Sequence, residues 1–191
     1  MNHYNNQLIK ETLDKVNQLS EEELKENIRK YFGEDYLIQE ETLSKLYPFQ
    51  NYVTNILGTL PLPIIYETIE QDSILDTKDE CIIINQKYYN NLLESSKCIA
   101  HEQRHYYQLA FIKQNPNDPF SIRLKEEFNN ETKITNFNDD NQVLNYQYQE
   151  KEIDAFAFTQ VIIFSYYHIN TTHPDKQYQA IIVAYKHKYY K

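Results

Sequence analysis

Glycine, cysteine and tryptophan are scarce in this chain of 191 residues, which contains two glycines, two cysteines and no tryptophan. A glycine-rich loop that cradles phosphate needs several glycines close together, so the glycine count excludes sites of that kind. Cys81 and Cys98 are too few for a disulfide framework. We therefore expect both to be reduced thiols in a reducing compartment.

Positive charge is also in short supply, because 28 acidic residues face 19 basic ones and the net charge is −9. An acidic chain is poorly suited to phosphate backbones, so nucleic acid is not expected as the main partner. No apolar run is long enough to span a membrane, and residues 1–6 lack the basic-then-apolar layout of a signal peptide. The sequence thus predicts a soluble, cytoplasmic protein. It does not indicate an oligomeric state.

Hydrophobic periodicity predicts an α+β chain in which helices precede a small sheet. We expect an N-terminal helical region at 1–57 and a second region at 58–191, packed together as one unit. The expected strands are 62–69 and 80–85, separated by a polar turn at 72–78. The expected helices cover 4–31, 41–57, about 88 or 95 to 113, 120–128, 145–167 and 175–190. Residues 114–144 are predicted to be a long loop that the short helix at 120–128 interrupts.

One motif stands out in the third of these helices: His101-Glu102-Gln103-Arg104-His105, a His-Glu-x-x-His pattern. Residues four apart on a helix lie on the same face, so His101 and His105 can occupy two neighbouring positions around a metal ion. Glu102 then lies close enough to take a proton from a water molecule at the open position. This spacing predicts a zinc site with Glu102 as a general base.

The third ligand is expected from the helix at 145–167, where Glu152 is the best candidate. Two small residues, Ala155 and Ala157, would allow this helix to approach the motif helix closely. Asp154 points about 200° away from Glu152 on an ideal helix, so both cannot be ligands of one ion. We expect Asp154 either to contact one of the metal ligands without binding the ion itself, or to be solvated.

The pattern of His101, Glu102 and His105 followed by Glu152-x-x-Ala155 resembles the gluzincins, and most closely the ImmA/IrrE-like and minigluzincin-type metallopeptidases. The resemblance covers roughly residues 60–165. It implies a zincin-like domain that holds Zn²⁺ through His101, His105 and Glu152. It also implies an endopeptidase that hydrolyses peptide bonds with a metal-activated water and acts on a protein or peptide, such as a regulatory protein.

The sequence departs from this family in two places. Arg104 stands where a small residue is usual, which affects the packing of the motif helix. The spacer from His105 to Glu152 is longer than in the smallest members, which suggests an insertion near the cleft. The strand at 80–85 is expected to form the rim of that cleft and to bind an extended substrate.

Several roles remain open at the level of the sequence. The donor that stabilises an oxyanion could be any of five side chains: Tyr148, Tyr166, Tyr167, His168 or His173. The chain could instead be a catalytically silent regulatory or interaction protein that keeps the metal site. A third possibility is a structural protein in which the motif arose by chance.

Overall fold

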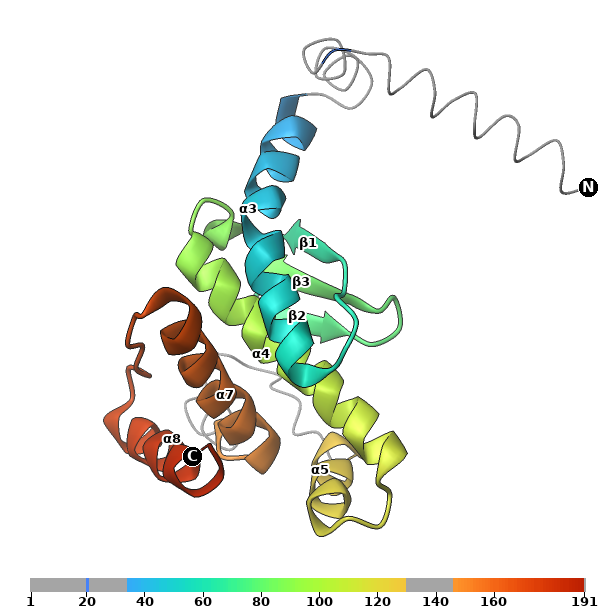
Figure 1. Cartoon of the computed structure of the whole chain (residues 1–191), viewed down its shortest axis with the longest axis vertical. Coiled ribbons are helices and arrows are strands. Elements are labelled where there is room, and N and C mark those ends of the chain that lie inside the picture. Colours follow the sequence, from blue (N-terminus) through green and yellow to red (C-terminus); the bar gives the residue numbers. More distant parts are fainter. Residues whose placement is uncertain (1–19, 21–33, 130–145, 191) are drawn as a thin grey trace, which may run out of the picture. The chain divides into compact units, whose positions relative to one another are not determined.

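The computed structural model describes residue 20 and residues 34–129 and 146–190 of the chain (Figure 1). The chain divides into two compact units, Met1–Ser44 and Lys45–Lys191. Helix α3 (Glu34–Leu57) continues across this division. Apart from residue 20, the helical segment predicted at 4–31 lies outside the described residues, as does the end of the predicted loop, 130–144. The boundary predicted at 57/58 stays a prediction.

The second unit contains a mixed three-stranded sheet in the order β1-β3-β2. The central strand, β3 (Cys81–Asn85), pairs in parallel with β1 (Ile64–Glu67) and antiparallel with β2 (Ser73–Asp76). The register places Ile64 and Leu75 on either side of Ile82, so these apolar side chains share one face of the sheet. A loop is fixed to the central strand by Asn85, whose side-chain amide donates hydrogen bonds to the carbonyls of Ile69 and Gln71.

Two long helices complete the architecture around this sheet. Helix α4 (Leu92–Gln114) contacts β2 and β3, and its first turn is capped by the side chain of Asn91, which accepts a hydrogen bond from the backbone N–H of Glu94. Helix α7 (Glu150–Tyr167) packs along α4 and is covered in turn by α8 (Lys176–Tyr189). The described part of the chain is therefore α+β, with the sheet and α7 both in contact with α4 (Figure 1).

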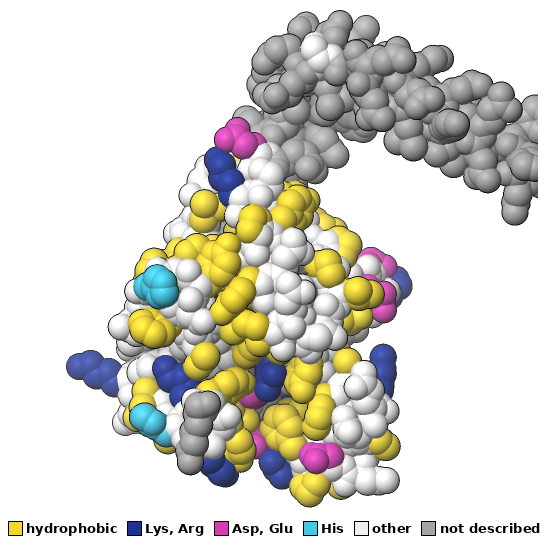
Figure 2. Space-filling model, in the orientation of Figure 1, with side chains coloured by type: hydrophobic (Ala, Val, Ile, Leu, Met, Phe, Trp, Pro, Cys, Tyr) yellow, Lys and Arg dark blue, Asp and Glu magenta, His cyan; other side chains and the backbone are white. Residues whose placement is uncertain are grey.

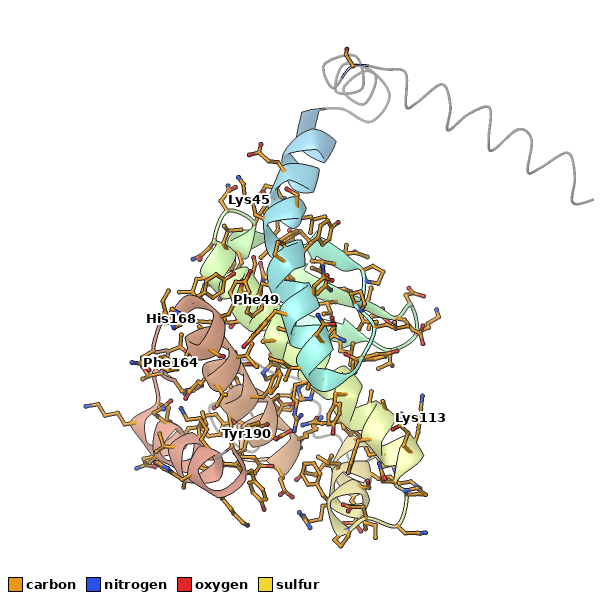
Figure 3. The ribbon with its side chains drawn as sticks, viewed as in Figure 1. Lys45, Phe49, Lys113, Phe164, His168 and Tyr190 are labelled. Atoms are coloured by element: carbon orange, nitrogen blue, oxygen red, sulfur yellow. The ribbon has the colours of Figure 1, made fainter. Side chains whose placement is uncertain are left out.

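The core of the second unit lies between these elements. Its fully buried apolar side chains include Leu46, Phe49 and Val53 of α3, Ile82 and Ile84 of β3, Ile99 of α4, and Ile163 of α7. Phe49 stacks on Tyr167 with ring centroids 5.4 Å apart, which joins α3 to the C-terminal end of α7 (Figure 3). This core holds α4 and α7 at a fixed separation.

Helix α5 (Pro119–Asn129) lies in the segment between the two halves of the predicted metal site. The Glu127 carboxylate accepts hydrogen bonds from the backbone N–H groups of Glu150 and Lys151, both at 2.8 Å. Both N–H groups belong to the first turn of α7, where donors have no carbonyl partner within the helix, and the N-cap residue, Gln149, makes no side-chain cap. Helix α5 thus caps the helix that carries Glu152.

The helix and strand predictions are confirmed in type at most positions, with two corrections. The stretch predicted as a turn at 72–78 forms β2, because Ile74 and Leu75 pair with the isoleucines of β3. The strand expected to bind substrate, 80–85, is the central strand, so both of its edges are already paired and it cannot receive a further strand.

The surface of the described part of the chain gives no sign of a membrane span. None of its helices is both long and apolar enough to cross a bilayer. Apolar side chains on the face shown in Figure 2 are interspersed with polar and charged ones, as is usual for protein surfaces.

Candidate metal centre

Three side chains from α4 and α7 converge on one point: His101, His105 and Glu152. The two histidine Nε2 atoms are 3.0 Å apart. The Glu152 carboxylate oxygens lie 3.2 Å from Nε2 of His101 and 3.4 Å from Nε2 of His105. Ligands about 2.05 Å from a tetrahedral zinc ion would be about 3.3 Å from each other. The predicted ligands are therefore brought together at separations that fit a metal ion.

Burial makes this cluster costly without a cation. Burial alone would raise the pKa of Glu152, but the adjacent His105 and His101 hold that pKa well below its ordinary range. Burial would likewise lower the pKa of His105, yet the Glu152 charge outweighs it and raises the pKa to about 9. Oε1 of Glu152 is buried and receives no hydrogen bond from the described residues. A buried carboxylate whose two oxygens each face one imidazole nitrogen suits a divalent cation.

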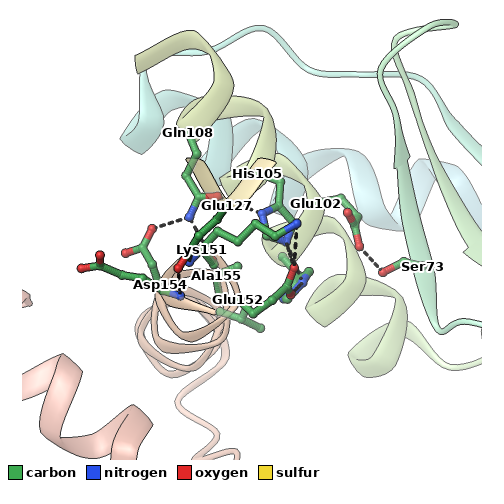
Figure 4. A network of polar contacts seen from close by, with 12 residues as sticks. Ser73, Glu102, His105, Gln108, Glu127, Lys151, Glu152, Asp154 and Ala155 are labelled. Carbon is green, nitrogen blue, oxygen red and sulfur yellow. Dashed lines mark hydrogen bonds and ion pairs between the residues drawn. The ribbon is translucent and has the colours of Figure 1, made fainter. Parts of the chain in front are cut away.

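Glu102 lies next to the first histidine and is 5% exposed. Its Oε1 accepts a hydrogen bond of 2.7 Å from the hydroxyl of Ser73 in β2 (Figure 4). Because Oε1 is engaged by the sheet, Oε2 is the oxygen left to accept a proton. No pattern in the sequence points to Ser73 as a partner of Glu102, because the sequence predicts a turn for this segment.

Asp154 is buried and bound rather than solvated. Its two oxygens accept four hydrogen bonds: from Nε and Nη2 of Arg104 at 2.7 and 3.1 Å, from Nε2 of Gln108 at 2.7 Å, and from the hydroxyl of Tyr190 at 2.7 Å. Gln108 in turn contacts Nδ1 of His105 at 2.9 Å. Asp154 therefore does not face the ion but is linked to His105 through Gln108, which is one of the two roles predicted from its position on the helix.

The five candidates for an oxyanion donor fall into two groups. Tyr166, Tyr167 and His168 lie at the C-terminal end of α7, where Phe49 packs against the two tyrosines. At 1.5 Å per residue they are about 21–24 Å along the helix from Glu152, so the structure excludes them as donors at the metal site.

Tyr148 and His173 belong to an aromatic cluster beside the metal site. His173 contacts Phe156 with centroids 5.5 Å apart, and Phe156 contacts His101 at 4.6 Å. Tyr148 and His173 both pack on Tyr178, at 5.6 and 4.8 Å. Burial lowers the pKa of His173, and its Nδ1 accepts a hydrogen bond from the backbone N–H of Asp175, so the remaining proton is on Nε2.

Lys151 and helix α5 also lie beside the candidate metal site, next to Glu152 and His105. The Lys151 side chain is 2% exposed, and its Nζ lies 3.8 Å from Oε1 of Glu152. The same Nζ lies 4.8 Å from the ring centroid of Phe128, which also packs edge-on against His105. The role of Lys151 was missed because a lysine preceding an acidic residue on a helix is normally a solvated side chain.

No family model, no curated protein and no solved structure matches this chain. The described residues nevertheless contain a group of two histidines and one glutamate that could hold a metal ion.

Proposed function

We propose that the chain is a zinc-dependent endopeptidase with a zincin-like fold. The observation that carries this proposal is the meeting of His101, His105 and Glu152, with Glu102 adjacent to His101 on α4. Two imidazoles and one carboxylate form the donor set of a hydrolytic zinc site, and a glutamate next to the first histidine is the usual general base. A zinc ion bound there would supply Lewis acidity, which makes water a stronger acid and a carbonyl carbon more electrophilic.

Glu102 is the proposed general base. Ser73 holds Oε1 and so fixes the orientation of the carboxylate, which leaves Oε2 to take a proton from the attacking water. The same oxygen would then deliver that proton to the nitrogen of the leaving amine. His173 and Tyr148 are the proposed donors to the negative charge on the carbonyl oxygen, through Nε2–H or the phenol O–H.

Strand β2 is the proposed binding edge for an extended peptide. Asn85 donates its backbone N–H to the carbonyl of Asp72, and alternation along an antiparallel pair then directs the N–H and C=O of Ser73 and Leu75 away from β3. Within residues 34–129 and 146–190, no strand pairs with this edge. A peptide added there would lie beside the residue that holds Glu102.

The proposed location is the cytoplasm, and the proposed substrates are proteins or peptides. Both cysteines are free and buried, which supports a reducing compartment. Strand addition recognises backbone rather than one particular side chain, so it suits a protein substrate with an extended segment.

The test compares the wild type with Glu102→Gln after loading each with one equivalent of zinc. Turnover of a peptide library is expected to fall at least about 100-fold in the variant, because the general base is lost while the three ligands remain. Zinc content, measured by mass spectrometry, should be equal in the two proteins. Glu94→Gln is the matched control, since Glu94 is on the same helix but pairs with Lys97 away from the site.

Three outcomes would count against the proposal. Equal turnover in wild type and Glu102→Gln would remove the assigned base. Zinc binding with no cleavage of any peptide would favour a catalytically silent metal-binding protein. Absence of bound zinc in the wild type, or its retention in His101→Ala, would leave a helical protein with a chance motif.

A further inference from the structure

The side chain of Gln108 connects a metal ligand to a buried ion pair (Figure 4). Its Nε2 lies 3.0 Å from the backbone carbonyl of Lys151 and 2.7 Å from Oδ2 of Asp154. A backbone carbonyl can only accept hydrogen bonds. The same holds for the Asp154 carboxylate, because it is paired with the guanidinium of Arg104. The amide nitrogen must therefore face them, and the amide oxygen must face His105.

This orientation decides which nitrogen of His105 carries a proton in the neutral ring. Oε1 of Gln108 can only accept, so Nδ1 of His105, 2.9 Å away, must be the donor. The lone pair is then on Nε2, which is the atom that faces His101 and Glu152. The opposite tautomer would place a lone pair against the lone pairs of Oε1 and a proton in the metal position.

The Gln108 amide is held in turn by Asp154, whose own hydrogen bonds fix its position. Each oxygen of Asp154 accepts two of its four hydrogen bonds, and three of the donors come from Arg104 and Tyr190. Tyr190 follows the last turn of α8, so the end of that helix is tied to the metal site through Asp154 (Figure 3). The guanidinium of Arg104 is also enclosed by the rings of Tyr107 and Phe158, at 4.6 and 5.2 Å.

We propose that Arg104, Asp154 and Gln108 form a positioning relay that holds His105 in the tautomer able to bind the metal. The relay rests on the metal site of the proposed function but does not require peptidase activity. It gives Arg104 a specific role, because the arginine supplies the charge and two of the donors that fix Asp154. Partners of this kind, behind a metal ligand, typically contribute 10–100-fold to metal affinity.

The first experiment measures the dissociation constant for zinc alone, by competition with a chromophoric chelator, in the full chain. Gln108→Leu is expected to weaken zinc binding by about 10–100-fold. Gln103→Leu is the matched control, because Gln103 is also a fully buried glutamine of α4 whose Nε2 donates two hydrogen bonds, to Thr59 and Leu60. Both variants should lower the unfolding temperature of the metal-free protein, but only Gln108→Leu should change the zinc affinity more than about threefold.

A second measurement needs no variant and so does not depend on folding of a mutant. In the zinc-loaded wild type, two-bond ¹H–¹⁵N spectra should show Nδ1 of His105 as the protonated nitrogen and Nε2 as the metal-bound one. The reverse assignment would overturn the relay, as would equal effects of the two glutamine substitutions or a wild type that binds no zinc.

The results also separate the relay from the proposed peptidase. Weak zinc binding in Gln108→Leu, together with no peptide cleavage by the wild type, would support the relay and reject the peptidase. Loss of turnover in Glu102→Gln, together with unchanged zinc affinity in Gln108→Leu, would support the peptidase and reject the relay.

Discussion

The zinc affinity of this chain should depend steeply on pH between 7 and 9. Zinc must displace the proton that Glu152 holds on His105, whose pKa is raised to about 9 in the metal-free protein. At pH 7 only about 1% of this imidazole would be neutral, so apparent affinity should be about 100-fold weaker than above pH 9. The dissociation constant is thus expected to fall about tenfold per pH unit from 7 towards 9 and then to level off.

The same proton affects the stability of the metal-free protein in the opposite direction. A pKa that rises from the ordinary 6.5 to about 9 on folding corresponds to about 3 kcal/mol. This contribution is complete below pH 6.5 and disappears as the pH rises through 9. The free energy of unfolding of the metal-free chain should therefore decrease by up to about 3 kcal/mol over that interval.

Both quantities can be measured on the same samples, by chelator competition and by urea unfolding at each pH. Glu152→Gln is the control, because without the carboxylate charge the pKa of His105 should return towards or below 6.5 and the pH dependence of stability between 7 and 9 should disappear. An affinity that is constant from pH 7 to 9, or a metal-free stability that does not fall in that range, would refute the assigned pairing of His105 with Glu152.

Two further results are expected. His173→Ala should lower turnover about 100-fold without changing zinc affinity. The control is His168→Ala, which removes an imidazole at the far end of α7 and should leave both quantities unchanged. Equal rates in wild type and His173→Ala would remove His173 as the oxyanion donor. Cys98 should resist thiol reagents in the native protein at pH 8, because burial raises the pKa of its thiol to about 12; rapid labelling before urea unfolding would contradict this.

The sequence predicted which three side chains meet in the candidate metal centre, because their spacing follows directly from helix geometry. His101 and His105 are one turn apart, and Glu152 could be placed on a second helix from its apolar periodicity and its neighbouring alanines. The sheet was harder to predict, since β2 has four residues and its pairing depends on β3 rather than on its own composition. Ser73 could not be assigned to Glu102 until that strand was placed.

Supporting contacts were missed for a different reason, which is that each depends on two helices at once. Gln108 could have been noticed, because it lies three residues after His105 on the same face of α4. Its partners on α7 and after α8, however, are set by packing that no local pattern records. Tertiary contacts of this kind are visible only when the helices are in place.

Two residues that do not fit the metal-site pattern, Arg104 and Asp154, are explained by their contact with each other. Arg104 departs from the small residue usual in the family that the motif resembles, and Asp154 lies on the wrong side of α7 to bind the ion with Glu152. In the structure the two are partners at 2.7 Å, both largely buried. A buried charge is stable only when it is paired, so removing one residue would leave the other uncompensated at a cost of about 3–5 kcal/mol. The arginine is therefore required by the aspartate that fixes Gln108, and the motif helix is attached to α7 by this pair as well as by the contacts of His101 and His105 with Glu152.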